Sequence, residues 1–257
     1  MYFAKLKGVK IIFVILAIIY VHISEIQPAY GQEIMEADTF LTDKGSFDIT
    51  FIGHASLLIN FRHKLIYVDP VMREADYSTM PKADLILVTH HHGDHLDSVA
   101  INHLLKKETL LIMPEKSKSL LRIKHKIKTI KAFDKKVLLF ARLEAVPAYN
   151  IVNLRKTGEP YHAKGEGVGY ILTLDNKRIY IAGDTENIPE MKTFNNIDIA
   201  FLPMNLPYTM SPEMVADAAI MFKPKILYPY HYSKTDTNKI KLLLHDKTEI
   251  DVRIRKF

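Results

Sequence analysis

An apolar run that ends abruptly in histidines and aspartates is the feature that most constrains this chain. The segment from Leu85 to Val88 is short, continuous and apolar, which is typical of a buried strand. Six titratable side chains follow within eight residues, and so many polar groups cannot be buried in an apolar core without partners. They are His90, His91, His92, Asp94, His95 and Asp97. The segment therefore predicts a strand that delivers polar side chains to a site at its carboxyl end.

The spacing inside this cluster indicates a metal site. In an extended segment His90 and His92 point the same way. Gly93 then allows the backbone to turn sharply, so Asp94 and His95 can face the same cavity. Imidazole and carboxylate groups that converge in this way suit Zn²⁺, with Mn²⁺, Fe²⁺ and Ni²⁺ as alternatives.

The H-x-H-x-D-H pattern at 90–95 resembles that of the metallo-β-lactamase fold superfamily. The resemblance implies an α/β fold, the αβ/βα four-layer sandwich, in which two sheets pack face to face and helices cover both outer sides. Antiparallel strand runs that twice give way to alternating strands and helices agree with that fold. Four further motifs resemble the L-ascorbate-6-phosphate lactonase-like and N-acyl-phosphatidylethanolamine phospholipase D-like branch. They are Gly-His-Ala-Ser at 53–56, His-Leu-Asp at 95–97, Ala-Gly-Asp-Thr-Glu at 182–186 and Pro-Tyr-His-Tyr at 229–232.

The resemblance implies a site for one or two metal ions with a carboxylate between them. A carboxylate has lone pairs on both oxygens, so Asp184 can bridge two cations. The remaining ligands that the resemblance implies are His90 and His92 for the first ion, and Asp94, His95 and His231 for the second. Asp69, at the end of an earlier strand, is expected to orient the metal-binding loop.

The third ligand of the first ion is open. Related branches carry a histidine at the strand end where this chain has Asn150, and His162 follows twelve residues later. Either Asn150 binds through its amide oxygen, or His162 completes the site, or only the second ion is held tightly. A neutral amide oxygen is a poorer ligand for zinc than an imidazole, which favours His162.

The resemblance implies a hydrolase in which a metal-activated hydroxide attacks an ester, lactone, amide or phosphodiester bond. Asp94 is expected to orient the nucleophile and then to transfer its proton, and His54 is expected to line the mouth of the site. Two alternatives stay open: a metal-dependent oxidoreductase on the same fold, and a non-catalytic exported metal-binding protein.

Composition limits the ligands and the partners. The 257 residues include no cysteine, which excludes disulfides and thiolate ligands. The formal net charge of +6 is too mild to indicate nucleic acid, so a small-molecule or lipid-like substrate is expected. Residues 122–136 carry seven Lys or Arg against one Asp, which is typical of a protected edge strand or of an electrostatic funnel for an anionic substrate. Nothing in the sequence indicates an oligomeric state.

The amino terminus predicts export. Three lysines precede a 13-residue run at 11–23 that is apolar except for His22, and Ala29-Tyr30-Gly31 follows. This order predicts a signal peptide at 1–31, cleaved near Gly31, and a periplasmic or secreted protein. An uncleaved signal anchor is the alternative, although 13 residues are short for a membrane span of about 20. Residues 32–44 are expected to be a polar lead-in, and 45–257 one hydrolase domain. Within it, Asp97 and Ser211 are expected to cap helices.

Overall fold

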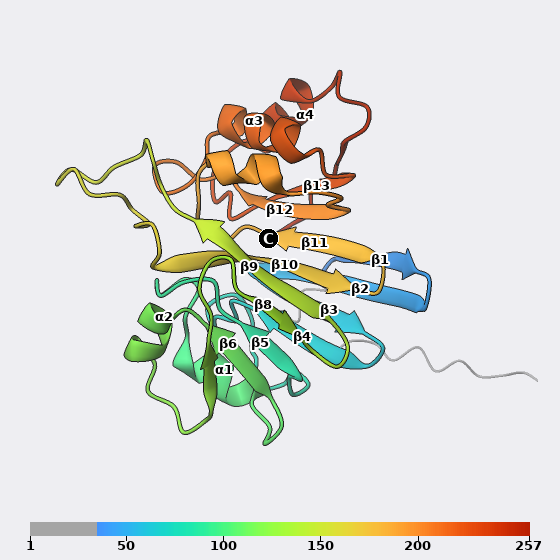
Figure 1. Cartoon of the computed structure of the whole chain (residues 1–257), viewed down its shortest axis with the longest axis vertical. Coiled ribbons are helices and arrows are strands. Elements are labelled where there is room, and N and C mark those ends of the chain that lie inside the picture. The colour runs from blue at the N-terminus through green and yellow to red at the C-terminus, as the bar shows by residue number, and fades with distance from the viewer. Residues whose placement is uncertain (1–34) are drawn as a thin grey trace, which may run out of the picture. The chain divides into compact units, whose positions relative to one another are not determined.

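The computed structural model describes residues 35–257, which form two seven-stranded sheets that pack face to face (Figure 1). The first sheet has the order β1 (Ala37–Thr42), β2 (Gly45–Gly53), β3 (Ser56–Phe61), β4 (Lys64–Val68), β5 (Leu85–Leu87), β6 (Leu110–Met113) and β7 (Ile127–Thr129). The second has the order β14 (Asp251–Val252), β13 (Ile226–Tyr230), β12 (Ile199–Pro203), β11 (Lys177–Ile181), β10 (Gly167–Leu174), β9 (Arg142–Ala148) and β8 (Lys135–Val137). In chain order, each sheet begins with four antiparallel strands and ends with parallel ones.

Alternation along the strands divides the apolar side chains among three cores. On β11, Ile179 and Ile181 face the other sheet while Tyr180 faces outward, because successive side chains point to opposite faces. The outer face of the first sheet is covered by α1 (Ser98–Leu104), and α2 (Glu115–Leu120) follows β6. The outer face of the second sheet is covered by η1 (Pro189–Thr193), α3 (Pro212–Phe222) and α4 (Asn238–Leu243). The predicted αβ/βα sandwich is confirmed.

Two of the helices begin where the sequence predicts. Asp97 accepts hydrogen bonds from the backbone N–H groups of Val99 and Ala100 at the start of α1. Ser211 accepts one from Met214 N at the start of α3, with Pro212 as the first helical residue. Such side-chain caps satisfy backbone donors that have no partner within the helix. The cap at Asp97 also fixes where the polar loop after β5 ends.

The first strand corrects one prediction. Residues 32–44 were expected to be a polar lead-in, but residues 37–42 form β1, which pairs antiparallel with β2. Its side chains are alternately exposed and half-buried, and only Phe40 packs against the core between the sheets. An edge strand of this kind needs little apolar sequence, since one face of it is solvated. The domain therefore begins before residue 45.

The basic segment at 122–136 lies at the open edges of the two sheets. It contains β7, the last strand of the first sheet, and leads into β8, the last strand of the second. The predicted signal peptide at 1–31 and its cleavage position lie outside the described residues. Between residues 35 and 257, no helix is both long and apolar enough to cross a bilayer.

Candidate active site

The candidate site lies where loops leave the carboxyl ends of strands from both sheets. Parallel strands such as β4 and β5, or β11, β12 and β13, end at the same edge of their sheet, so the residues that follow them converge. Strands β2, β4, β5, β9, β11 and β13 are followed by His54, Asp69, the 90–95 cluster, Asn150, Asp184 and His231 respectively.

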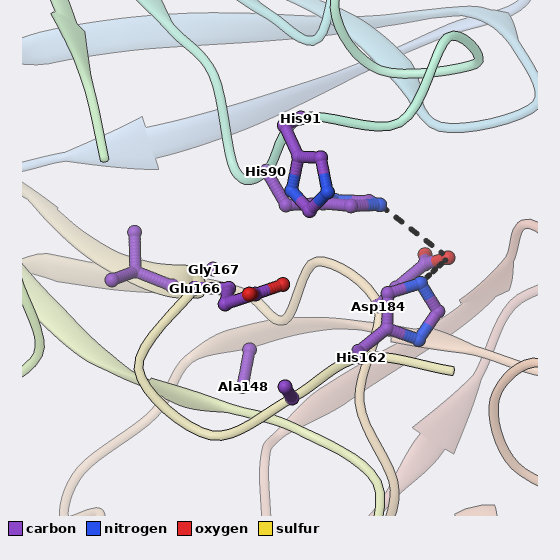
Figure 2. Close-up of a pocket in the computed structure, with 9 residues that line it drawn as sticks. His90, His91, Ala148, His162, Glu166, Gly167 and Asp184 are labelled. Carbon is purple, nitrogen blue, oxygen red and sulfur yellow. Dashed lines mark ion pairs between the residues drawn. The ribbon is translucent and has the colours of Figure 1, made fainter. Parts of the chain in front are cut away.

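Three histidines form the first group of donor atoms. His92 Nδ1 lies 3.2 Å from His90 Nε2 and 3.1 Å from His162 Nε2. Asp184 Oδ2 lies 3.1 Å from His162 Nε2 and 3.8 Å from His90 Nε2 (Figure 2). One carboxylate oxygen of Asp184 thus faces this group.

The other oxygen of Asp184 faces a second group. Asp184 Oδ1 lies 3.3 Å from His95 Nε2 and 3.4 Å from His231 Nε2. Asp94 Oδ2 lies 3.6 Å from His231 Nε2 and 3.3 Å from His54 Nε2. The two groups therefore share Asp184, and each oxygen of this carboxylate belongs to one of them.

The donor atoms fit a metal centre. Ligands about 2.0–2.2 Å from a tetrahedral ion lie roughly 3.3–3.6 Å from one another, close to the separations seen here. His95 Nε2, His231 Nε2 and Asp184 Oδ1 are buried and have no hydrogen-bond partner among the described residues, although buried polar atoms are normally paired. The donors are imidazole and carboxylate only, a set that suits zinc, manganese, iron or nickel.

Comparison with known proteins agrees with this geometry. Residues 48–231 match the family model of the beta-lactamase superfamily domain. A UPF0173 metal-dependent hydrolase from Pelotomaculum thermopropionicum is 30% identical over 226 residues, which cover 80% of this chain and 95% of the relative. The chain belongs to the UPF0173 metal-dependent hydrolases of the metallo-β-lactamase superfamily.

Solved structures support the same assignment. A proposed metal-dependent hydrolase from Parabacteroides distasonis is 49% identical and has a TM-score of 0.82, with 87% of this hydrolase and 99% of that chain covered. The metallo-β-lactamase fold protein YhfI from Bacillus subtilis is 12% identical and has a TM-score of 0.64, with 82% and 96% covered, which shows a shared fold. The predicted superfamily and the predicted hydrolase class are thereby confirmed.

The histidines of the hydrolase site differ in the direction in which their pKa values are shifted. Burial lowers the pKa of His92 to about 4 and holds the pKa of His90 well below its usual value, so both rings are neutral at pH 7. Burial also disfavours a charged His95, but the carboxylates of Asp184 and Asp69 outweigh it and hold the pKa of His95 well above its usual value. A metal ion entering the second group must therefore displace a proton from His95.

The two carboxylates that point into the hydrolase site are ionised. Burial opposes the charge of Asp184, but the neighbouring His231 and His95 outweigh it, so the pKa of Asp184 lies well below its usual value. Burial likewise opposes the charge of Asp94, and the neighbouring imidazoles of His231 and His54 outweigh it and hold the pKa of Asp94 far below its usual value. Both groups therefore offer lone pairs at neutral pH.

Asp69 orients the first loop, as the resemblance implies. It is completely buried and accepts hydrogen bonds from Thr89 N at 2.7 Å, Thr89 Oγ1 at 2.6 Å and His95 Nδ1 at 2.8 Å. With its hydroxyl proton given to Asp69, Thr89 Oγ1 accepts from His90 Nδ1 at 3.1 Å. A proton held at Nδ1 directs the Nε2 atoms of His90 and of His95 toward the donor groups.

Asn150 orients His162 instead of facing the donor groups itself. Its amide oxygen accepts from His162 N at 3.0 Å and from His162 Nδ1 at 2.7 Å. Its amide nitrogen donates to Glu186 Oε1 and to Tyr208 O, both at 3.0 Å. Since acceptors surround the nitrogen and donors the oxygen, the orientation of the amide is fixed. The arrangement favours His162 as the third donor of the first group.

Glu186 is the functional residue that sequence reasoning missed. This buried carboxylate accepts hydrogen bonds at 2.7 Å from the backbone N–H groups of Ile151, Val152 and Asn153, besides the one from Asn150. Burial disfavours its charge, yet these donors outweigh burial and lower the pKa of Glu186. Its place two residues after Asp184, in the Gly-Asp-Thr-Glu segment, was visible in the sequence, but its partners were not.

Two cavities border the donor groups. A cavity of about 360 Å³ opens onto them and is lined by His92, Asp94, Arg155, Tyr161, His162, Asp184, Asn205, Tyr208 and His231. On the other side, His91 and Glu166 border a smaller cavity together with His90, His162 and Asp184 (Figure 2). His91 therefore faces away from the larger cavity.

His54 lies beside the second group of donor atoms. It contacts Asp94 at 3.3 Å, and its ring lies against that of His231 with ring centres 3.8 Å apart.

Proposed function

We propose that this chain is an exported hydrolase with a two-metal centre that cleaves an ester, lactone, amide or phosphodiester bond. The observation that carries the proposal is the position of Asp184, whose two oxygens each face a separate group of imidazole nitrogens. The first ion would be held by His90, His92 and His162 and the second by Asp94, His95 and His231, with one oxygen of Asp184 facing each group.

Zinc is the ion we propose, since the donors are mainly imidazoles. When bound, the metal supplies Lewis-acid polarisation of the substrate and lowers the pKa of a water molecule toward about 7. The rest of the chemistry falls to the side chains around the larger cavity.

Asp94 orients the attacking water and transfers its proton. Its ionised carboxylate lines the cavity and is held by His54 and His231. The oxygen of water forms a bond to the acyl or phosphoryl centre, the bond to the leaving group breaks, and the proton of water passes through Asp94 to the leaving atom. His54 keeps the carboxylate in place through the contact at 3.3 Å.

A substrate screen with matched variants tests this proposal. Purified protein, loaded with zinc, manganese, iron or nickel, is assayed with a 4-nitrophenyl ester, a γ-lactone, a 4-nitroanilide and bis(4-nitrophenyl) phosphate. We expect turnover in at least one class, its loss in Asp184→Asn, and an unchanged circular dichroism spectrum. Absence of turnover in all four classes by protein with full metal content would contradict the proposal.

We place the enzyme in the lactonase-like and phospholipase D-like branch. The support is Gly-His-Ala-Ser at 53–56 and Pro-Tyr-His-Tyr at 229–232, whose histidines, His54 and His231, lie with ring centres 3.8 Å apart. In the same screen, a rate with the lactone or the phosphodiester above that with the anilide is expected. The opposite order would argue for another branch.

Export is proposed from the sequence alone. Basic residues, the apolar run at 11–23 and Ala29-Tyr30-Gly31 support a signal peptide cleaved near Gly31. Amino-terminal sequencing of the exported fraction is expected to start near residue 32. A chain that still begins at Met1 in that fraction would favour the uncleaved anchor.

A further inference from the structure

We infer that Arg155 binds an anionic group of the substrate, so that the bond cleaved belongs to a molecule with a carboxylate or phosphate away from the scissile bond. The inference rests on the proposed function, because it places that anion in the same cavity as the donor groups. It names Arg155 as a residue that determines specificity.

Among the described residues, 35–257, Arg155 supplies the only Lys or Arg side chain that lines the 360 Å³ cavity. The same cavity is bordered by His92, Asp94, Asp184 and His231 on its inner side. No residue of the basic segment at 122–136 lines it. The positive charge available to a bound substrate, apart from the metal centre, therefore comes from this single guanidinium.

The guanidinium of Arg155 is held in place by an aromatic residue and not by an acid. Its Cζ lies 4.9 Å from the ring centre of Tyr161, and one terminal nitrogen donates to Tyr161 O at 3.2 Å. Among residues 35–257, no Asp or Glu oxygen lies within 4.0 Å of it. A guanidinium has five N–H donors, so most of them are available to a ligand.

The loop that carries Arg155 is pinned along its length. The backbone N of Arg155 donates to Glu159 O at 2.7 Å, and the carbonyl of Arg155 accepts from Gly158 N at 2.9 Å. A bridge pairs Leu154 with Pro160, and Asn150 N donates to His162 O at 2.9 Å. The same closed loop therefore carries the proposed ligand His162 and the cation, which reduces the entropy lost when a substrate is bound.

The planar shape of the Arg155 guanidinium indicates which anionic groups it would bind. A planar guanidinium forms two parallel hydrogen bonds to a carboxylate or a phosphate, which a lysine cannot do. Beside it, Tyr161 and Tyr208 meet edge to face with ring centres 5.1 Å apart. The part of the substrate between the scissile bond and the anion is therefore expected to lie along an aromatic wall.

Two esters that differ in one charge test the inference. Mono-4-nitrophenyl adipate and 4-nitrophenyl hexanoate share the leaving group and the six-carbon acyl chain, and only the adipate ester carries a distal carboxylate. In Arg155→Gln we expect kcat/KM for the adipate ester to fall about 10- to 100-fold, as for a lost charged hydrogen-bonded pair. The hexanoate ester should change by less than about threefold, a size typical of a weak surface effect.

Lys156→Gln is the matched control. It removes the same charge one residue along the loop, and Lys156 does not line the cavity. Neither ester should then change by more than about threefold, since exposed charges act weakly through solvent. Equal losses for both esters in Arg155→Gln would mean a general effect on the loop and would overturn the inference, as would no loss for either.

Calorimetry separates this inference from the proposed function. If neither ester is turned over, ester hydrolysis fails, while binding of adipate against hexanoate to metal-loaded protein still reports on the anion site. Adipate should bind about 10-fold or more tightly than hexanoate, and this ratio should vanish in Arg155→Gln. Equal affinities for the two acids in the unsubstituted protein would refute an anion site at Arg155.

Discussion

Two of the loops that bring histidines to the site, those after β5 and β9, are each held by a buried carboxylate. The loop after β5 is held by Asp69, which bonds the candidate ligand His95 directly and His90 through one hydroxyl group. The loop after β9 is held by Glu186, which acts on His162 only through Asn150 and three backbone N–H groups. A buried carboxylate therefore contacts a candidate ligand directly in the first loop, and only through other groups in the second.

The difference shows how a donor can be moved along the chain without losing its place. The resemblance to related branches implies a histidine at the strand end where this chain has Asn150, and His162 lies twelve residues further on. The asparagine keeps the strand-end position and uses both halves of its amide to aim the later ring. Substitutions of Asp69 and of Glu186 should therefore differ in their effects on stability and on metal affinity.

The largest effect is expected for Asp69→Ala. Removing this fully buried carboxylate leaves His95 and Thr89 without their acceptor, and breaking a buried pair costs about 3–5 kcal/mol. Metal affinity should also fall about 10- to 100-fold, since the rings lose their orientation. Urea unfolding with and without metal measures both. An unfolding free energy that stays within experimental error of the unsubstituted value would rule out this role for Asp69.

A smaller and pH-dependent loss is expected for Glu186→Gln. In this variant an amide replaces a carboxylate that accepts hydrogen bonds from four N–H groups. The free energy of unfolding should therefore fall by about 2 kcal/mol at pH 7. The pKa of Glu186 is lowered by folding, so its stabilisation is present above the ordinary carboxyl pKa and is lost as pH falls through the lowered pKa. The difference between variant and parent should therefore shrink between pH 7 and pH 3. Glu159→Gln, on the exposed part of the same loop, is the control.

The smallest contrast concerns two glycines. Gly183 has φ +63°, and an added Cβ would lie 2.9 Å from Thr89 Cβ, so Gly183→Ala should cost about 1–2 kcal/mol. Gly93 has no such contact within 4 Å and no left-handed φ, and Gly93→Ala should cost less than about 0.5 kcal/mol. Thermal unfolding decides this. The turn predicted at Gly93 is present, since His95 N donates to His92 O at 3.0 Å, and a larger cost at Gly93 would mean that this turn requires glycine.

The parts of the site that the sequence predicted are those with consecutive or strand-end residues. The 90–95 cluster, Asp184 and His231 each follow a strand, and a strand's periodicity is visible in the sequence. The fold was predicted from the resemblance that these motifs carry, and the order of strands and helices agreed with it. Strand β1 was missed because it is half-solvated, with little apolar alternation to detect.

The roles of Glu186, Asn150 and Arg155 were not predictable. Glu186 binds backbone groups 33 to 35 residues away, and a backbone N–H looks the same in every sequence. Arg155 lies at the cavity in a loop that is closed by hydrogen bonds between Asn150 and His162. Such contacts depend on the path of a loop, which local residue patterns do not determine.

The central claim is that His162, aimed by Asn150, completes the first group. Metal content after dialysis against buffer with and without excess Zn²⁺, measured by elemental analysis in His162→Ala, Asn150→Ala and His90→Ala, tests it most directly. We predict that His162→Ala loses as much metal as His90→Ala, and that Asn150→Ala retains its metal when excess ion is supplied, with an affinity about 10- to 100-fold lower. Loss in Asn150→Ala with full occupancy in His162→Ala would contradict the account, and full occupancy in both would show that neither residue holds the ion.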